Sequence, residues 1–176
     1  MTSGGEGLLA DGSRPATHDD LFARFRDLEI EAHTVEHPPV FTVEEAKALR
    51  GKLAGGHTKN LFLRNKKGAM WLVVCLEDRS IDLKELAQRL GAGRFSFGSA
   101  DRLMKYMGVI PGAVTPFGII NDTGGMVRVV LERAMLEMDT LNFHPLDNAK
   151  TTALAAADLV RFLEAEDHRP EIIDLS

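Results

Sequence analysis

Two apolar segments joined by a short polar turn constrain this chain more than any other feature of its sequence. Residues 59–64 and 69–76 have the length and composition of β-strands, and Asn65-Lys66-Lys67-Gly68 between them is typical of a turn. The pattern predicts a β-hairpin, so any fold for this chain has to contain this antiparallel pair of strands.

Helix-capping residues mark the starts of several helices. A Ser, Thr or Asp precedes an apolar segment with helical spacing, and glycines stand where three of these segments stop. The predicted helices cover residues 17–28, 42–49, 82–91, 99–108 and 156–166.

Shorter apolar segments predict further strands. They lie at residues 33–37, 140–143 and around Ile172, and a second hairpin is expected from 118–121 and 126–131 about a turn at 122–125. Because hairpins and helices are interspersed, we expect a mixed α/β (α+β) fold with a largely antiparallel or mixed sheet surrounded by helices.

Length and composition are consistent with one domain. The chain has 176 residues, of which 44% are hydrophobic, enough for a single core. Residues 1–16 are rich in Gly, Ser, Asp and Pro and are expected to form a flexible leader before a domain at 17–176. One Cys cannot form an internal disulfide, and neither a membrane-spanning segment nor a signal peptide is evident. A cytoplasmic protein without membrane contact is therefore expected.

Charge is unevenly distributed along the chain. The net charge of −5 argues against a protein that coats DNA or other nucleic acid over its whole surface. Residues 46–76, however, contain seven basic residues and no acidic one, which leaves −12 for the rest of the chain. This segment is either a solvated face or a docking patch for a polyanion.

Metal and covalent catalysis find no support in the sequence. His33 and His37 lie four apart on a predicted strand, too far to share one ion, and no CxxC, HExxH or GxSxG motif is present. Cys75 lies within an apolar segment and is expected to be buried. We therefore expect no metal and no cofactor.

Two glycine-rich stretches could nevertheless carry chemistry. Residues 55–64 deliver Lys59 and Asn60 to the start of an apolar strand, where a cation can polarise a carbonyl or bind a ribose or phosphate. Residues 108–118 contain three Gly and two Pro, so their backbone N–H groups can hold an oxyanion. An ordinary structural turn is the alternative interpretation of the second stretch.

The same stretches resemble the YbaK/ProX superfamily of aminoacyl-tRNA editing domains. Gly112 to Pro116 fits the GxxxP loop of that family, and residues 57–63 resemble its lysine-bearing strand. Further matches lie at 36–38, 143–148 and 151–152, so that the resemblance spans about residues 17–175. It is strongest to the free-standing prolyl-tRNA editing members.

The resemblance implies the fold of that family and a trans-editing hydrolase that removes alanine from mischarged tRNA(Pro). Such a proofreading step is needed because a missing methylene changes binding by only about 1–3 kcal/mol. An aminoacyl ester is already activated, so the site has only to orient water and stabilise the oxyanion. Alternatives are the same fold acting on Cys-, Ser- or Thr-charged tRNA, a catalytically silent module that binds tRNA or synthetase, and a small nucleotide-binding regulator.

Residue roles follow from the resemblance and from the chemistry of the side chains. The catalytic group comprises Lys59, Asn60, Gly112 and Ala113. Substrate contacts are expected from Val40, Phe41, Leu61, Ile110, Val114, Thr115, Pro116, Phe117 and His144, of which Phe41 and Phe117 could stack on the terminal adenine and His144 could act as a base. Contacts to tRNA are expected from Lys47, Arg50, Lys52, Arg64, Lys66, Lys67, Arg102 and Lys105. Prolyl-tRNA synthetase and elongation factor are candidate further partners.

Overall fold

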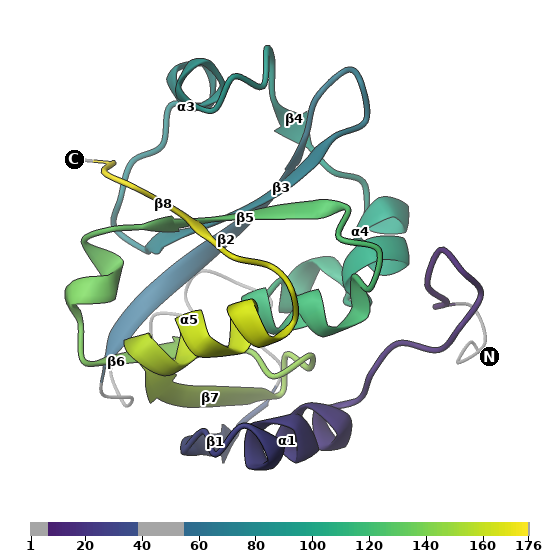
Figure 1. The fold of residues 1–176 in the computed structure, drawn as a ribbon, viewed down its shortest axis with the longest axis vertical. Helices are drawn as coiled ribbons and strands as arrows, with labels where there is room; N and C mark the ends of the chain where they lie inside the picture. Colours follow the sequence, from purple (N-terminus) through teal and green to yellow (C-terminus); the bar gives the residue numbers. More distant parts are fainter. Residues whose placement is uncertain (1–6, 39–54, 176) are drawn as a thin grey trace.

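A mixed β-sheet runs through the middle of the molecule. The computed structural model describes residues 7–38 and 55–175, and within these the sheet has eight strands. Its order is β1-β7-β6-β2-β3-β5-β8, and β4 pairs with β2. The strands are β1 Ala32–Glu36, β2 Gly56–Arg64, β3 Met70–Leu76, β4 Ser96–Phe97, β5 Val127–Glu132, β6 Thr140–Phe143, β7 Lys150–Ala155 and β8 Glu171–Ile173. The expected mixed α+β fold is confirmed (Figure 1).

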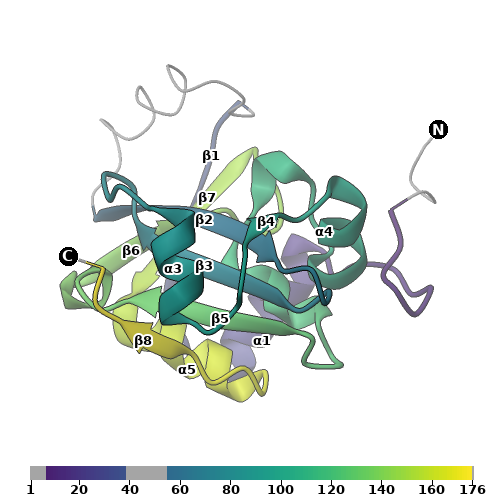
Figure 2. The same ribbon diagram turned by 90° about the horizontal axis from the view of Figure 1, so that it is seen from above.

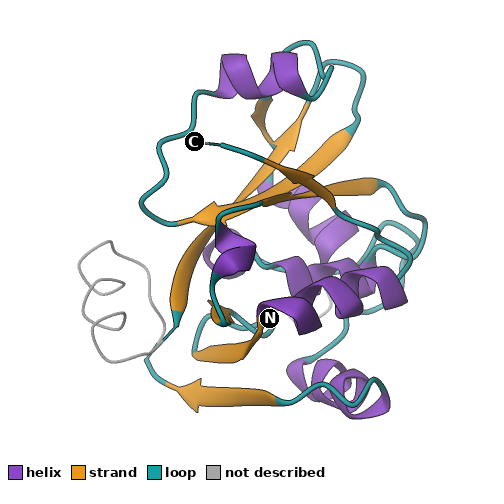
Figure 3. Ribbon diagram, turned by 60° about the vertical axis from the view of Figure 1, so that its left-hand side comes forward, coloured by secondary structure: helices purple, strands orange, loops and turns teal. Residues whose placement is uncertain are grey.

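Helices cover both faces of this sheet (Figure 3). The α-helices are α1 His18–Asp27, α3 Leu83–Arg89, α4 Ala100–Met107 and α5 Ala156–Ala165, and the 3-10 helices are η2 Pro111–Ala113, η3 Pro116–Asn121 and η4 Met135–Glu137. The side chains of Thr17, Asp82 and Ser99 accept hydrogen bonds from the first turns that follow them, and Gly108 ends α4 with φ +68°. These caps confirm three of the predicted helices, and α5 confirms a fourth without a side-chain cap, whereas the predicted helix 42–49 lies outside the described residues.

The two faces of the sheet bury different clusters. We call the face that carries Phe62, Val74 and Leu141 the core face, because α1, α4 and α5 pack against it in the larger cluster. The opposite face carries Leu63 and Trp71 under α3, and we call it the α3 face. Figure 2 shows α3 on the near side of β2 and β3, with α1 and α5 behind the sheet.

The first predicted hairpin is confirmed and the second is wrong. β2 and β3 pair antiparallel from Thr58↔Leu76 to Arg64↔Met70. Residues 118–121 instead belong to η3, because Pro116 fixes the backbone at its start and the Thr115 hydroxyl accepts a hydrogen bond from the Phe117 N–H. β5 therefore pairs with β3 and β8, both in parallel.

One edge of β2 is open over a short interval. On that edge β6 pairs in parallel only with Gly56 and His57, and β4 pairs antiparallel with Leu63 and Arg64. Within the described residues no strand pairs with the edge between these two contacts. We call residues 58–61 of this edge the open edge of β2, because the carbonyl of Phe62 already accepts from the N–H of Gly98.

Residues 9–16, predicted to lie in a flexible leader, are tied to the domain at two points. The N–H of Ala10 donates to the carbonyl of Lys105 at 2.9 Å, and the N–H of Ala16 donates to Oδ1 of Asn121 at 2.8 Å. The domain boundary at residue 17 stays a prediction. Among the described residues, every helix is too short or too polar to cross a lipid bilayer.

Candidate functional site

Lys59 and His144 lie on the same face of neighbouring strands. β2 and β6 pair in parallel at His57↔Asn142, and Lys59 and His144 each follow two residues later. Since side chains alternate along a strand, both project from the α3 face. They stand where the pairing of the two strands ends, beside the open edge of β2.

The imidazole of His144 is a neutral acceptor. Its Nδ1 lies 2.9 Å from the carbonyl oxygen of Lys150, and a carbonyl can only accept, so Nδ1 carries the proton and Nε2 has a free lone pair. Burial lowers the pKa of His144, and the neighbouring charge of His37 lowers it further, against the opposing hydrogen bond to Lys150. At neutral pH this ring can therefore accept a proton.

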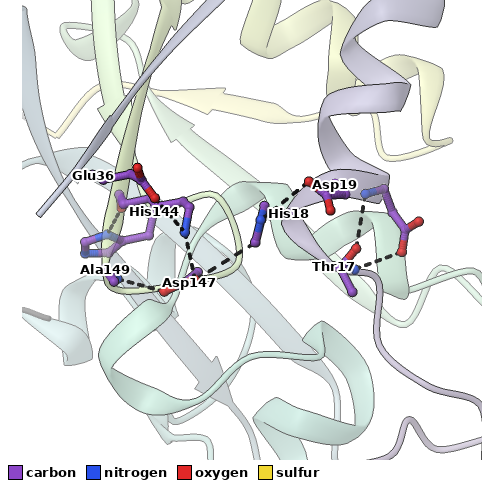
Figure 4. A network of polar contacts seen from close by, with 9 residues as sticks. Thr17, His18, Asp19, Glu36, His144, Asp147 and Ala149 are labelled. Carbon is purple, nitrogen blue, oxygen red and sulfur yellow. Dashed lines mark hydrogen bonds and ion pairs between the residues drawn. The ribbon is translucent and has the colours of Figure 1, made fainter. Parts of the chain in front are cut away.

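A network of charges holds the turn that carries His144 (Figure 4). Nζ of Lys150 lies 3.5 Å from Oδ2 of Asp147 and 3.7 Å from Oε1 of Glu36, and Nδ1 of His18 is 4.0 Å from the same Asp147 oxygen. The pKa of the Asp147 carboxyl is lowered, first by the N–H of Ala149 and then by the charge of Lys150. The network fixes the β6–β7 connection from both sides.

His37, which directly follows β1, contacts the same region. Its Nε2 lies 2.8 Å from the hydroxyl of Thr151, and its ring centroid is 6.2 Å from that of His144. The sequence suggested His37 as a position of the family resemblance and as a rejected metal ligand but gave no signal for Lys150, because the link between β1, β6 and β7 depends on β7, a strand that was not predicted.

Lys59 is half-buried and lies opposite Cys75 of β3. The Cys75 thiol is fully buried, as expected, and burial raises its pKa to about 11 although the charge of Lys59 opposes this. Cys75 is therefore a protonated thiol and contributes no nucleophile.

Asn60 projects from the core face, opposite to Lys59. Its Oδ1 is buried and has no hydrogen-bond partner. The carbonyl of His57 accepts from Glu77 on the β3 side, so the backbone N–H and C=O of Asn60, three residues further, point to the open edge. A buried acceptor without a partner costs about 1–3 kcal/mol, which a bound donor can recover.

The glycine-proline loop at 108–118 is anchored to the core face. Ala113 is buried, and Val114 packs against the same cluster. Thr115 and Pro116 are buried at the start of η3, whereas Ile110 is 49% exposed. The loop and Lys59 therefore lie on opposite sides of the sheet, and a ligand can reach both only around the open edge of β2.

Phe117 cannot stack on a base. Its ring has no exposed surface and packs edge-on against Phe25, Phe143 and Phe162. The expected contact between this side chain and the terminal adenine is therefore wrong, because the first turn of η3 directs the ring into the core.

Several expected tRNA contacts lie near the β2–β3 turn. Lys66 and Lys67 are exposed at that turn, Arg64 ends β2, and a Cβ on Gly68 would lie 3.9 Å from the guanidinium of Arg102. Lys105 is 3.0 Å from Asp101 and is thereby partly neutralised. Five expected residues lie outside the described part of the chain: Val40, Phe41, Lys47, Arg50 and Lys52.

No metal site is found among residues 7–38 and 55–175, which contain no group of three or more potential ligands. His33 lies 3.3 Å from Glu31 in an exposed pair, so its imidazole has a local partner.

Comparison with known proteins places this arrangement in a family. The aminoacyl-tRNA editing domain matches residues 37–162. The prolyl-tRNA editing protein ProX of Acetoanaerobium sticklandii is 37% identical over 156 residues, which cover 88% of this chain and 95% of that protein. The prolyl-tRNA synthetase associated domain-containing protein 1 of Mus musculus is 39% identical over 160 residues, with coverage of 88% and 94%.

A solved structure of a candidate trans-editing enzyme for prolyl-tRNA synthetase has the same fold. Its TM-score is 0.68 at 16% identity, and the match covers 92% of this chain and 98% of that one. The residues that the family matches, 37–162, include both β2 and β6. This chain belongs to the aminoacyl-tRNA editing domain family.

Proposed function

We propose that this protein hydrolyses the ester between alanine and tRNA(Pro), and so proofreads prolyl-tRNA synthesis in the cytoplasm. The observation that carries the proposal is the placement of a cation, Lys59 of β2, and a neutral imidazole, His144 directly after β6, at the point where the pairing of these two strands ends. The likeness to ProX supports the choice of tRNA(Pro).

The residues divide the chemistry of ester hydrolysis between them. The ammonium of Lys59 stabilises the oxyanion that forms when water attacks the ester carbonyl. His144 accepts the proton of that water, or of the ribose hydroxyl that activates it, through Nε2. Asn60 offers its backbone N–H and C=O, which point to the open edge, to the amino group or ribose of the substrate. The backbone of Gly112 and Ala113 binds on the other side of the open edge.

Alanine is selected by size in this proposal. Leu61 projects from the α3 face next to Lys59 and narrows the space for the amino-acid side chain. A small pocket accepts a methyl group and refuses the pyrrolidine ring of proline. Prolyl-tRNA synthetase, named in the mouse relative, and elongation factor are the proposed partners that deliver the charged tRNA.

The test measures single-turnover deacylation of tRNA(Pro) charged with Ala, Pro, Cys, Ser or Thr. We expect Ala-tRNA(Pro) to react fastest, Lys59→Ala to slow it by about 100- to 1,000-fold, as for the loss of one oxyanion donor, and Lys59→Arg to restore part of the rate. Faster turnover of another charged tRNA would refute the alanine assignment. A rate that does not depend on Lys59 would leave a binding module as the function.

A further inference from the structure

Phe97 is an aromatic side chain that the proposed chemistry leaves unused. It is 61% exposed, the largest exposed fraction among the large hydrophobic side chains of the described residues. Single exposed apolar residues are common on protein surfaces, so exposure alone assigns nothing. Its position relative to Lys59 is what distinguishes it.

Phe97 is held rigidly in spite of its exposure. The N–H of Gly98 donates to the carbonyl of Phe62 at 2.9 Å, and a Cβ on Gly98 would lie 2.4 Å from the Phe62 ring, so the backbone rests directly on a core side chain. Two residues before Phe97, the ring of Phe95 packs edge-on against Trp71 with centroids 5.0 Å apart. The aromatic surface of Phe97 is therefore presented at low conformational cost.

Phe97 lies on the same face of the sheet as Lys59. It pairs with Leu63, and Leu63 is four residues after Lys59 on β2. Four residues of extended protein chain span about 13 Å. This distance equals about four stacked nucleotides at 3.4 Å each, or fewer nucleotides when the nucleic acid is stretched. If the terminal ribose of a single-stranded nucleic acid lies at Lys59, the base of one of its last few nucleotides therefore reaches Phe97.

Two cations without ion-pair partners lie on the same side of the sheet as Phe97, at the hollow lined by Phe95. Lys84 and Arg94 line a hollow of about 510 Å³ together with Phe95, whereas Arg64 follows Leu63 on β2 and so projects from the core face, away from Phe97. No carboxylate of the described residues forms an ion pair with Lys84 or Arg94. The acidic residues of the α3 region, Asp82 and Glu85, line a separate hollow instead. Figure 2 shows β4 between α3 and α4.

We propose that Phe97 stacks on a base of the unpaired 3′ end of the tRNA, with Lys84 and Arg94 binding the adjoining phosphates. Proteins bind single-stranded nucleic acid with an aromatic side chain on which a base stacks and with neighbouring basic side chains that bind the phosphates. The proposal rests on the proposed function, because Lys59 marks where the charged end of the strand lies. A protein partner or a second copy of this chain would lack the phosphates that these cations need.

The test compares two substrates that share the ester but differ in the upstream nucleotides: Ala-tRNA(Pro) and 3′-alanyl-adenosine. Stacking is worth about 1–3 kcal/mol per base, so Phe97→Ala should lower kcat/KM for Ala-tRNA(Pro) about 5- to 150-fold, through KM. Hydrolysis of 3′-alanyl-adenosine should be unchanged. Phe97→Trp should restore the rate on tRNA, and Met126→Ala, which also removes an exposed hydrophobic side chain, should match the wild type.

Equal losses on both substrates, no loss on tRNA, or failure of Phe97→Trp to restore the rate would overturn the proposal. A change of oligomeric state in Phe97→Ala, seen by light scattering, would identify a second copy as the occupant and would also overturn it. If the wild type hydrolyses neither substrate, the proposed function fails while stacking remains testable. Phe97→Ala must then weaken binding of uncharged tRNA but not of tRNA trimmed of its unpaired 3′ nucleotides.

Discussion

Removal of the imidazole of His168 should destabilise the fold in a pH-dependent way. His168 and Asp122 are 7% and 3% exposed, and Nε2 of His168 lies 2.8 Å from Oδ2 of Asp122. Nδ1 of the same ring lies 2.6 Å from the carbonyl oxygen of Glu166. Both partners are acceptors, so both ring nitrogens carry protons and the ring is an imidazolium.

The direction of the pH effect follows from the pKa of His168. Burial opposes the charged form, but the hydrogen bonds to Asp122 and Glu166 outweigh it and raise the pKa. A raised pKa in the folded state gives stability that is complete below the unfolded value of about 6.5 and is lost as the pH rises through the folded value. The free energy of unfolding should therefore fall with rising pH above that unfolded value.

The size of the destabilisation follows from the buried charge of Asp122, which remains when the imidazolium is removed. Loss of one member of a buried ion pair costs about 3–5 kcal/mol, and the lower end applies because Asp122 keeps the N–H groups of Met126 and Val127 at 3.1 and 2.7 Å. For a domain of this size His168→Ala should lower Tm by about 6–12 °C at pH 6. His168→Gln keeps a donor without the charge and should lose the pH dependence.

Urea unfolding at pH 6 and pH 8.5, followed by the fluorescence of Trp71, measures both effects, because this single Trp is 3% exposed in the folded state. His33→Gln serves as the matched control, since the His33–Glu31 pair is exposed and should contribute less than about 1 kcal/mol. If His168→Ala behaved like this control, or His168→Gln kept the pH slope of the wild type, the imidazolium would not be a stabilising charge.

Three further outcomes are expected. Gly98→Ala should cost about 1–3 kcal/mol in urea unfolding, because its Cβ would lie 2.4 Å from the Phe62 ring; unchanged stability would contradict the close packing of β4. Glu132→Ala should cost about 3–5 kcal/mol in the same assay, since this fully buried carboxylate accepts hydrogen bonds from Arg79 at 2.6 Å and Leu76 at 2.9 Å, and a loss below 1 kcal/mol would argue against that pair. Cys75, whose thiol is buried with a pKa raised to about 11, should react with a disulfide reagent at pH 8 only after unfolding, and fast reaction of the folded protein would show that the site opens.

Local signals in the sequence predicted the elements that local interactions determine. The caps at Thr17, Asp82 and Ser99 and the turn at 65–68 act within a few residues, so reading the sequence was sufficient to place them. The strand expected at 118–121 was wrong because a capping Thr before a proline favours a 3-10 turn over the β-propensity of Ile119 and Ile120.

The long-range part of the fold was not predictable in this way. β7 was missed because Lys150–Ala155 shows no strict alternation of apolar and polar residues, and one of its two partners, β1, is distant in sequence. The resemblance to a family identified Lys59 and His144, but only the register of β2 and β6 shows that they share a face. Phe97 was missed because a strand of two residues has no periodicity.

The open edge of β2 also has a consequence for solubility. Unpaired strand edges invite strands from other molecules and so promote aggregation. Here an incoming strand would meet a parallel neighbour at His57 and an antiparallel one at Leu63, and the carbonyl of Phe62 already accepts from the N–H of Gly98, so that only residues 58–61 remain for pairing, fewer than a typical strand has. The protein can therefore leave backbone groups available to a small ligand while its own copies cannot polymerise through them.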